Sequence, residues 1–123
     1  MDDKVFEDEI FEDKDFRETG FTKAKYDNCT FNNCSLANAD LSDVVFVECE
    51  FNNSDLTMVK IIDTALREVV FEKCKLLGVA FDSCNTFLLS LNFVKCDLNL
   101  ASFHGLKLKG ISFVECRLHE VDF

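Results

Sequence analysis

The sequence predicts an all-β solenoid of about six four-sided coils, and a repeat of five residues is the main observation behind this prediction. A large apolar residue occupies every fifth position from Phe6 to Phe81, and after a two-residue insertion the series continues from Leu88 to Phe123. Residues five apart are rotated by about 140° on a helix and lie on opposite faces of a flat strand, so neither structure gathers them on one side. We therefore expect the chain to turn a corner every five residues, with each large side chain pointing inward from a new wall.

A second repeat, of twenty residues, gives the number of walls in each coil. Reading every twentieth residue, with allowance for the insertion, gives a column of Phe11, Phe31, Phe51, Phe71, Phe93 and Phe113. The next wall gives Phe16, Leu36, Leu56, Leu76, Leu98 and Leu118. Columns this uniform are expected when residues twenty apart stack directly, so four pentapeptides make one coil. Six coils stacked at the inter-strand spacing of about 4.8 Å form a rod roughly 29 Å long.

The position two residues before each large residue is a second inward site, and most of its occupants are small. In the middle of the chain it holds Ala24, Cys29, Cys34, Ala39, Val44, Cys49, Ser54, Val59, Thr64, Val69, Cys74 and Val79. Small and large side chains that alternate in this way fill an interior at close-packed density. We expect a solid core with neither a pore nor a ligand pocket.

The first coil, residues 1–20, differs from the rest of the single domain predicted for residues 1–123. Its small inward positions hold Lys4, Glu9 and Lys14, and its other residues are rich in acids. We interpret this coil as a polar, acidic end cap, because charge on a terminal strand protects its open edge from aggregation.

The two-residue insertion lies within residues 82–92 and breaks the register of one wall. A bulged corner is the expected structure. The alternative is a small protruding contact that exposes Phe87 or Leu89.

The pentapeptide unit itself carries a resemblance to a known family. The order small residue, Asp or Asn, Leu or Phe, and two variable residues recurs, for example at 39–43 (ADLSD), 54–58 (SDLTM) and 96–100 (CDLNL). Over nearly its whole length the chain resembles the pentapeptide-repeat family. The resemblance implies a right-handed quadrilateral β-helix, whose handedness the spacing alone does not supply.

Composition predicts where the protein resides. No run of 18 apolar residues is present, so we expect no membrane span. The opening residues 1–4 lack the basic and apolar regions of a secretory signal, which favours a cytoplasmic location.

The seven cysteines fall at or beside the small inward positions, where we expect them to act as buried packing residues. They are Cys29, Cys34, Cys49, Cys74, Cys84, Cys96 and Cys116. Parallel side chains in one column cannot place four sulfurs around one zinc ion, so no metal is predicted. Neighbours such as Cys74 and Cys96 lie within reach of a disulfide, but a reducing compartment and the odd number favour free thiols.

Catalytic signatures are missing from the sequence. The two histidines, His104 and His119, occupy outward positions without an arranged acid or Ser partner. Neither a phosphate-binding Gly loop nor a nucleophile elbow is present, and a packed prism offers no pocket for a substrate. We predict a protein that is not an enzyme and has no cofactor.

Negative charge is concentrated in the first half of the chain. Residues 1–50 contain 14 acids and 5 bases, so they carry a net charge of −9, whereas the whole chain carries −10. The candidate partner-binding residues are Asp8, Glu48 and Glu68, which recur at one outward position, and Asp43 and Asp63, which recur at the preceding corner. We expect these five to form an acidic strip along one edge of the first four coils, unless Lys23, Lys25, Lys60 and Arg67 interrupt it and leave an ordinary solvated face.

The family resemblance also implies a class of function. Some pentapeptide-repeat proteins, including the Qnr-type quinolone-resistance proteins of bacteria, mimic DNA and bind DNA gyrase. Duplex DNA carries roughly 17 charges over 29 Å, so a chain with a net charge of −10 is a partial mimic. We expect a non-enzymatic interaction module that binds a protein such as DNA gyrase, and neither nucleic acid nor a membrane. The alternative is a structural pentapeptide-repeat domain or fragment without a dedicated partner.

The last residue, Phe123, occupies an inward position, which leaves a strand edge and part of the core open. Two expectations follow. Either two copies meet through this C-terminal end as a homodimer, or the natural protein continues with further coils.

Overall fold

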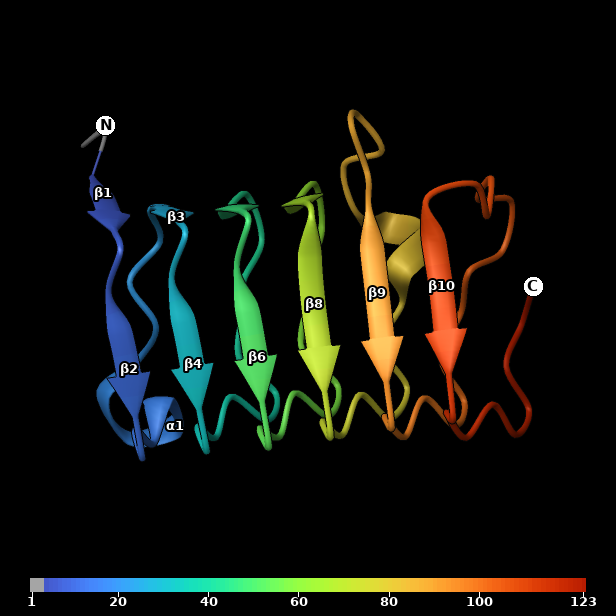
Figure 1. Cartoon of the computed structure of the whole chain (residues 1–123), viewed down its shortest axis with the longest axis horizontal. Coiled ribbons are helices and arrows are strands. Elements are labelled where there is room, and N and C mark those ends of the chain that lie inside the picture. The colour runs from blue at the N-terminus through green and yellow to red at the C-terminus, as the bar shows by residue number, and fades with distance from the viewer. Residues whose placement is uncertain (1–3) are drawn as a thin grey trace.

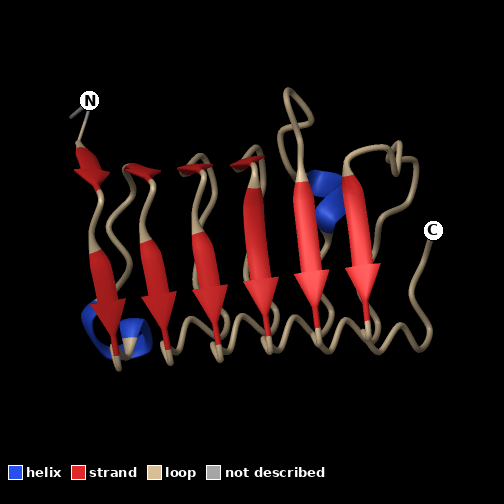
Figure 2. Cartoon of the chain, in the orientation of Figure 1, coloured by secondary structure: helices blue, strands red, loops and turns tan. Residues whose placement is uncertain are grey.

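The chain forms a right-handed quadrilateral β-helix, described for residues 4–123 by a computed structural model (Figures 1 and 2). In Figure 1 the strands that face the viewer run downward while the chain advances from left to right and returns behind them, which is the right-handed sense. All strand pairs are parallel and join residues twenty or twenty-two apart. The predicted fold class is confirmed. Residues 1–3 of the predicted first coil lie outside the described residues.

Two adjacent walls of the prism are parallel sheets. Wall 1 has the strand order β1-β3-β5-β7, formed by β1 (Val5–Glu7), β3 (Lys25–Asp27), β5 (Val45–Val47) and β7 (Ala65–Arg67). Wall 2 has six strands, one from each coil: β2 (Ile10–Glu12), β4 (Thr30–Asn32), β6 (Glu50–Asn52), β8 (Val69–Glu72), β9 (Leu91–Val94) and β10 (Ile111–Val114). Walls 3 and 4 consist of single parallel bridges, such as Ser35 with Asp55 and Asp40 with Lys60. Two short helices interrupt the walls, α1 (Phe16–Thr19) and the 3₁₀ turn η1 (Phe81–Ser83).

The predicted phenylalanine column forms the centre of the core beneath wall 2. The strand register places Phe31 opposite Phe51 and Phe51 opposite Phe71. The rings of Phe31 and Phe51 are stacked with centroids 4.5 Å apart, and those of Phe71 and Phe93 are 5.3 Å apart. Burial of these large side chains supplies most of the driving force for folding.

The corners explain why the repeat has five residues. Almost every residue two positions after a large inward residue has a positive φ, including Asp8 (55°), Asn33 (52°) and Lys73 (53°). Asn and Asp tolerate this left-handed conformation better than other non-glycine residues, which favours the many Asn and Asp at these positions. Most corner N–H groups then donate to the following coil, as from Asn53 to the carbonyl of Glu72 at 2.9 Å. We call these residues corner residues.

The small inward positions also serve as hydrogen-bond donors. Cys49 Sγ donates to the carbonyl of Tyr26 at 3.2 Å, and Thr64 Oγ1 donates to the carbonyl of Leu41 at 2.7 Å. A buried polar group is costly unless it is paired, so Cys, Ser and Thr fit these positions because each reaches a backbone carbonyl. All seven cysteines are free thiols in the structure, and six of them are buried.

The insertion changes wall 1 more than a simple bulge would. Asn85 still pairs with Ala65, and Leu91 still pairs with Val69, so six residues span a distance that regular coils cross in four. The extra length leaves the prism as a loop, seen in Figure 1 above the start of β9. Wall 1 has no strand beyond β7 within residues 4–123.

Two positions in the predicted five-residue series are corrected by the structure. Leu88 was expected to point inward, but its side chain is 63% exposed, and Leu89 packs against the core instead. Because the loop must rejoin the register at Leu91, its return limb supplies the inward residue. Leu108 is likewise 43% exposed, while Leu106 packs against the core.

The exposed loop residue Phe87 matches the alternative that the sequence left open for the insertion. Its side chain is 64% exposed, and its ring centroid lies 5.4 Å from Cζ of Arg67. The loop is therefore a protrusion, and Phe87 in it contacts Arg67 of wall 1.

At the C-terminal end, β10 is the outer strand of wall 2, and Phe123 is half exposed although it stacks on Phe103. Pairing of two copies through this end stays a prediction. Within residues 4–123 no helix is long and apolar enough to cross a membrane.

Candidate interaction surface

Three of the predicted partner-binding residues share one corner column between walls 1 and 2. Asp8, Glu48 and Glu68 are corner residues of the first, third and fourth coils, and Asn28 is the corner residue of the second. The backbone N–H groups of Asp8, Asn28 and Glu48 donate to the following coil, as from Glu48 to the carbonyl of Arg67 at 2.8 Å, whereas beside Glu68 it is the N–H of Val69 that donates, to Ser90. All three carboxylates are exposed, and Asn28 Nδ2 donates to Asp8 Oδ1 at 2.9 Å.

The other two predicted residues, Asp43 and Asp63, lie at a different corner. They are corner residues between walls 4 and 1, and their N–H groups donate to Ile62 and Ser83. The expectation of one acidic strip along one edge is therefore corrected. The five residues flank wall 1 on both sides, because the turn in the backbone between Asp43 and Glu48 puts a whole strand between them.

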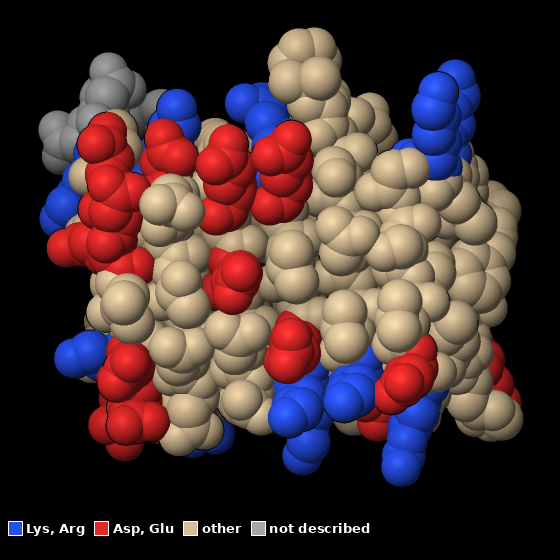
Figure 3. Space-filling view, viewed as in Figure 1, with Lys and Arg blue, Asp and Glu red and all other residues tan. Residues whose placement is uncertain are grey.

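The corner shared by walls 1 and 2 carries more acids than the sequence analysis assigned to it. Figure 3 shows a row of acidic side chains along the upper edge, over the first four coils. Seven acids lie within two residues of the four corner residues, namely Glu7, Asp8, Glu9, Asp27, Glu48, Glu50 and Glu68. We call these seven residues the acidic edge. Arg67 is the one base in the same windows.

The four basic residues that the alternative interpretation placed across the strip have different surroundings. Lys23 Nζ lies 3.3 Å from Asp40 Oδ2, and hydrogen bonds from Ser42 together with Lys23 lower the pKa of Asp40 to about 2. Arg67 lies under Phe87, and its Nε is buried without a hydrogen-bond partner among the described residues. Lys23 is thus paired with an acid outside the acidic edge, and Arg67 packs against the loop that carries Phe87.

The remaining two bases stand on the walls between the corners. Lys25 belongs to β3 on wall 1, and Lys60 pairs with Asp40 on wall 4. Both are exposed. Wall 1 therefore carries mixed charge, whereas its edge with wall 2 is acidic.

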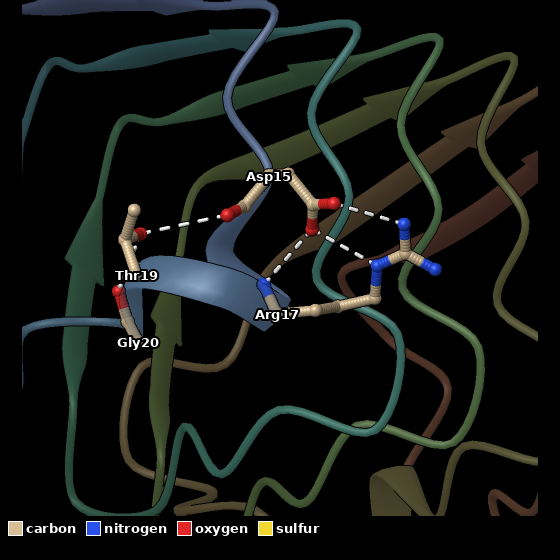
Figure 4. Close-up of polar contacts among 4 residues, drawn as sticks. All are labelled: Asp15, Arg17, Thr19 and Gly20. Carbon is tan, nitrogen blue, oxygen red and sulfur yellow. Dashed lines mark hydrogen bonds and ion pairs between the residues drawn. The ribbon is translucent and has the colours of Figure 1, made fainter.

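The polar first coil lies at one end of the acidic edge and contains a helical turn in place of a corner. Figure 4 shows Asp15 capping this turn: its Oδ1 accepts from the backbone N and Nε of Arg17 at 3.0 and 2.9 Å. The hydrogen bond from the Arg17 side chain lowers the pKa of Asp15. Gly20, at φ 78°, ends the turn by donating to the carbonyl of Phe16 at 2.9 Å, and Phe21 then rejoins the core.

The histidines are solvent-exposed, and the imidazole of each lies near one carboxylate. His104 Nδ1 lies 3.6 Å from Asp122, and His119 Nε2 lies 3.9 Å from Glu120. Each pair joins one imidazole to one carboxylate. Among the described residues, no group of three or more His, Cys, Asp or Glu could hold a metal ion.

A basic corner was missed by the sequence analysis. Lys73 and Lys95 are corner residues between walls 2 and 3, in the fourth and fifth coils, with Lys75 and Arg117 beside them on wall 3. Figure 3 shows these positive charges along the lower edge, towards the C-terminal end. Reading every twentieth residue at the corner positions, as was done for the inward positions, would have found them.

Comparison with known proteins identifies the family of the repeat. A family model described as a pentapeptide repeat region matches residues 24–86. Full-length QnrB1, a plasmid-mediated fluoroquinolone resistance protein, aligns with 16% identity and a TM-score of 0.49, covering 96% of this chain and 60% of QnrB1. A trypsin-treated QnrB1 variant aligns with 20% identity and a TM-score of 0.43, covering 94% of this chain and 68% of that one. No curated protein matched the sequence.

Proposed function

The chain belongs to the pentapeptide-repeat family, and from this premise we propose that it is a non-enzymatic interaction module whose acidic edge binds a DNA-handling protein such as DNA gyrase. The observation that carries the proposal is the acidic edge itself. Its corner carboxylates are exposed, and its spacing is set by the backbone ladder.

The charge density of the acidic edge is comparable with that of DNA. Four coils span three inter-strand steps, or about 14 Å, over which duplex DNA carries roughly 8 charges. The acidic edge presents seven carboxylates over the same length. A basic surface that accepts the DNA backbone would therefore meet a similar density of negative charge, held on a rigid frame.

The net charge of −10 also favours a protein partner over nucleic acid. A chain with this charge repels phosphate groups, while a basic protein surface is attracted. The proposal places the site of action in the bacterial cytoplasm, and the expected phenotype is protection against quinolones.

The test is a DNA gyrase supercoiling assay in the presence of a quinolone. The protein is expected to preserve supercoiling, and the double variant Glu48→Lys/Glu68→Lys is expected to lose this protection. The matched control is Glu115→Lys/Glu120→Lys, because these residues are also exposed corner residues with φ values of 53° and 55°. The control changes the net charge by the same amount in the sixth coil and is expected to retain protection.

A second pair, Asp43→Lys/Asp63→Lys, tests whether the corner between walls 4 and 1 takes part. Absence of any effect of the unmodified protein on quinolone inhibition, together with no direct binding to gyrase, would contradict the proposal. That result would favour the alternative of a structural domain without a dedicated partner.

A further inference from the structure

The coil-to-coil ladder of wall 1 is open between the fifth and sixth coils. In regular coils the first residue of wall 1 donates its N–H to the preceding coil, and Asn85 still donates to the carbonyl of Thr64 at 2.9 Å. Lys107 occupies the same place in the sixth coil, where its N–H would reach the carbonyl of Cys84. No such hydrogen bond is formed in the described chain. The N–H of Lys107 and the carbonyl of Cys84 are therefore left without ladder partners, while the N–H groups of Leu89 and Leu106 are used within their own loops, by Thr86 and Phe103.

The open ladder closes again only where the two coils approach wall 2. Leu91 donates its N–H to the carbonyl of Gly110 at 2.9 Å. A Cβ on Gly110 would lie 3.3 Å from the carbonyl oxygen of Leu89, and its φ is 86°, so glycine permits this close approach. One end of the gap is thus tightly closed, and the rest is held apart by the two loops.

The result is a slit with an apolar floor. One lip is the loop 86–89 and the other is the loop 105–109, and both line the same hollow. Leu89 and Leu106 pack against the core at its base, while Leu88 is exposed on the first lip. In Figure 1 these are the two loops that precede β9 and β10.

Positive charge borders the slit. Lys107 and Lys109 both line it and are exposed, and no Asp or Glu lines it. Neither lysine takes part in an ion pair within residues 4–123. In Figure 3 basic side chains project from the upper edge near the C-terminal end.

We propose that this slit binds an extended peptide segment that carries apolar side chains and at least one carboxylate. The open backbone groups of the sixth coil pair with the backbone of such a segment, as in other cases of strand addition to a sheet edge. An apolar side chain covers Leu89 and Leu106, and the carboxylate meets Lys107 or Lys109. The surface lies in the fifth and sixth coils and requires an acidic partner, so it is independent of the acidic edge.

The test uses a phage-displayed library of random heptapeptides, selected on the full-length protein and counter-selected on the Lys107→Glu/Lys109→Glu variant. The enriched peptides are expected to combine Asp or Glu with Leu, Ile, Val or Phe. Fluorescence polarisation of a labelled selected peptide is expected to show affinity about tenfold weaker for this variant. The matched control is Lys73→Glu/Lys95→Glu, which makes the same charge change at two exposed lysines on the basic corner and is expected to bind like the unmodified protein.

Two further measurements place the peptide. Amide chemical shifts of residues 105–110 are expected to change on binding, while those of β5 and β6 do not. A copy of the selected peptide with N-methylated backbone amides is expected to bind more weakly, since it cannot donate to the open ladder.

Three results would overturn the proposal. The first is that selected peptides bind the Lys107→Glu/Lys109→Glu and Lys73→Glu/Lys95→Glu variants with equal affinity. The second is that the changes in amide chemical shift are confined to other walls. The third is that the library yields no peptide whose binding depends on Lys107 and Lys109. Circular dichroism of each variant shows that a loss of binding is not a loss of fold.

Discussion

At the scale of single residues, the inward column of wall 2 gives the sharpest test of the fold. Phe71 is 3% exposed and stacks between Phe51 and Phe93 with centroid distances of 5.1 and 5.3 Å. Replacing Phe71 by Ala leaves a cavity that rings above and below cannot fill without breaking the strand register. We expect Phe71→Ala to lower the free energy of unfolding by about 3–5 kcal/mol, measured by urea denaturation.

The control for this prediction is Ile10→Ala, at an outward position of the same wall that is 66% exposed. It is expected to change stability by no more than about 0.5 kcal/mol. A loss below about 1 kcal/mol for Phe71→Ala would mean that Phe71 does not support the column.

The buried thiols predict a loss of stability at alkaline pH. Burial raises the pKa of Cys49 to about 12, and its Sγ donates to the carbonyl of Tyr26. In the unfolded chain a thiol ionises near pH 8.5. Because the folded pKa is the higher one, the stabilising contribution is complete below about pH 8.5 and is lost as the pH rises towards 12.

The measurement is the urea midpoint between pH 7 and pH 11. It is expected to fall with pH, and to fall less in Cys49→Val, because valine occupies the equivalent inward position at Val44, Val59 and Val69. Identical pH profiles for the two proteins would show that Cys49 ionises freely in the folded state.

At the scale of elements, the sequence predicts wall 2 well and wall 1 only in part. The six strands of wall 2 follow from the twenty-residue columns, since each large residue there is flanked by a regular corner. The insertion was located in the sequence, but its internal register depends on which limb of the loop supplies the inward residue. Leu88 and Leu89 are equally apolar, so the pattern could not choose between them, and the backbone closure at Leu91 made the choice.

The candidate surface, too, could be predicted from the sequence only in part. The acidic positions followed from the five-residue spacing, but assigning Asp43 and Glu48 to one edge required the direction of each side chain at its corner. That direction is a property of the left-handed backbone, which places consecutive corners on either side of a wall. The open slit depends on missing hydrogen bonds between two loops, for which the sequence pattern contains no signal.

The loop itself offers a test of this register. Deleting Thr86 and Phe87 restores the twenty-residue spacing and places Leu88 above Leu66 in the inward column. A cysteine introduced as Leu88→Cys is expected to react rapidly with a maleimide in the full-length chain, where position 88 is exposed, and slowly in the deletion variant. The seven native thiols give the background rate, which is expected to be low because six of them are buried. Equal labelling of both proteins would contradict this account of the insertion.

At the scale of the whole molecule, charge is distributed along the rod as well as around it. The acidic edge occupies the first four coils, and the basic corner and the lysines of the slit occupy the last three (Figure 3). Opposite charges towards the two ends give the rod a dipole moment along its axis, and this dipole would orient a charged partner before contact. The two proposed surfaces can therefore be examined separately, because variants of one leave the charge of the other unchanged.

The corner residues have a further consequence. Most of their backbone N–H groups donate to the next coil, while their side chains point away from the packed interior. Asp, Asn, Glu, Lys, Met and Gly all occupy these positions in this one chain. The distance between successive coils is therefore constant while the corner side chains can vary. Evolution can change the chemistry that this surface displays without changing the fold.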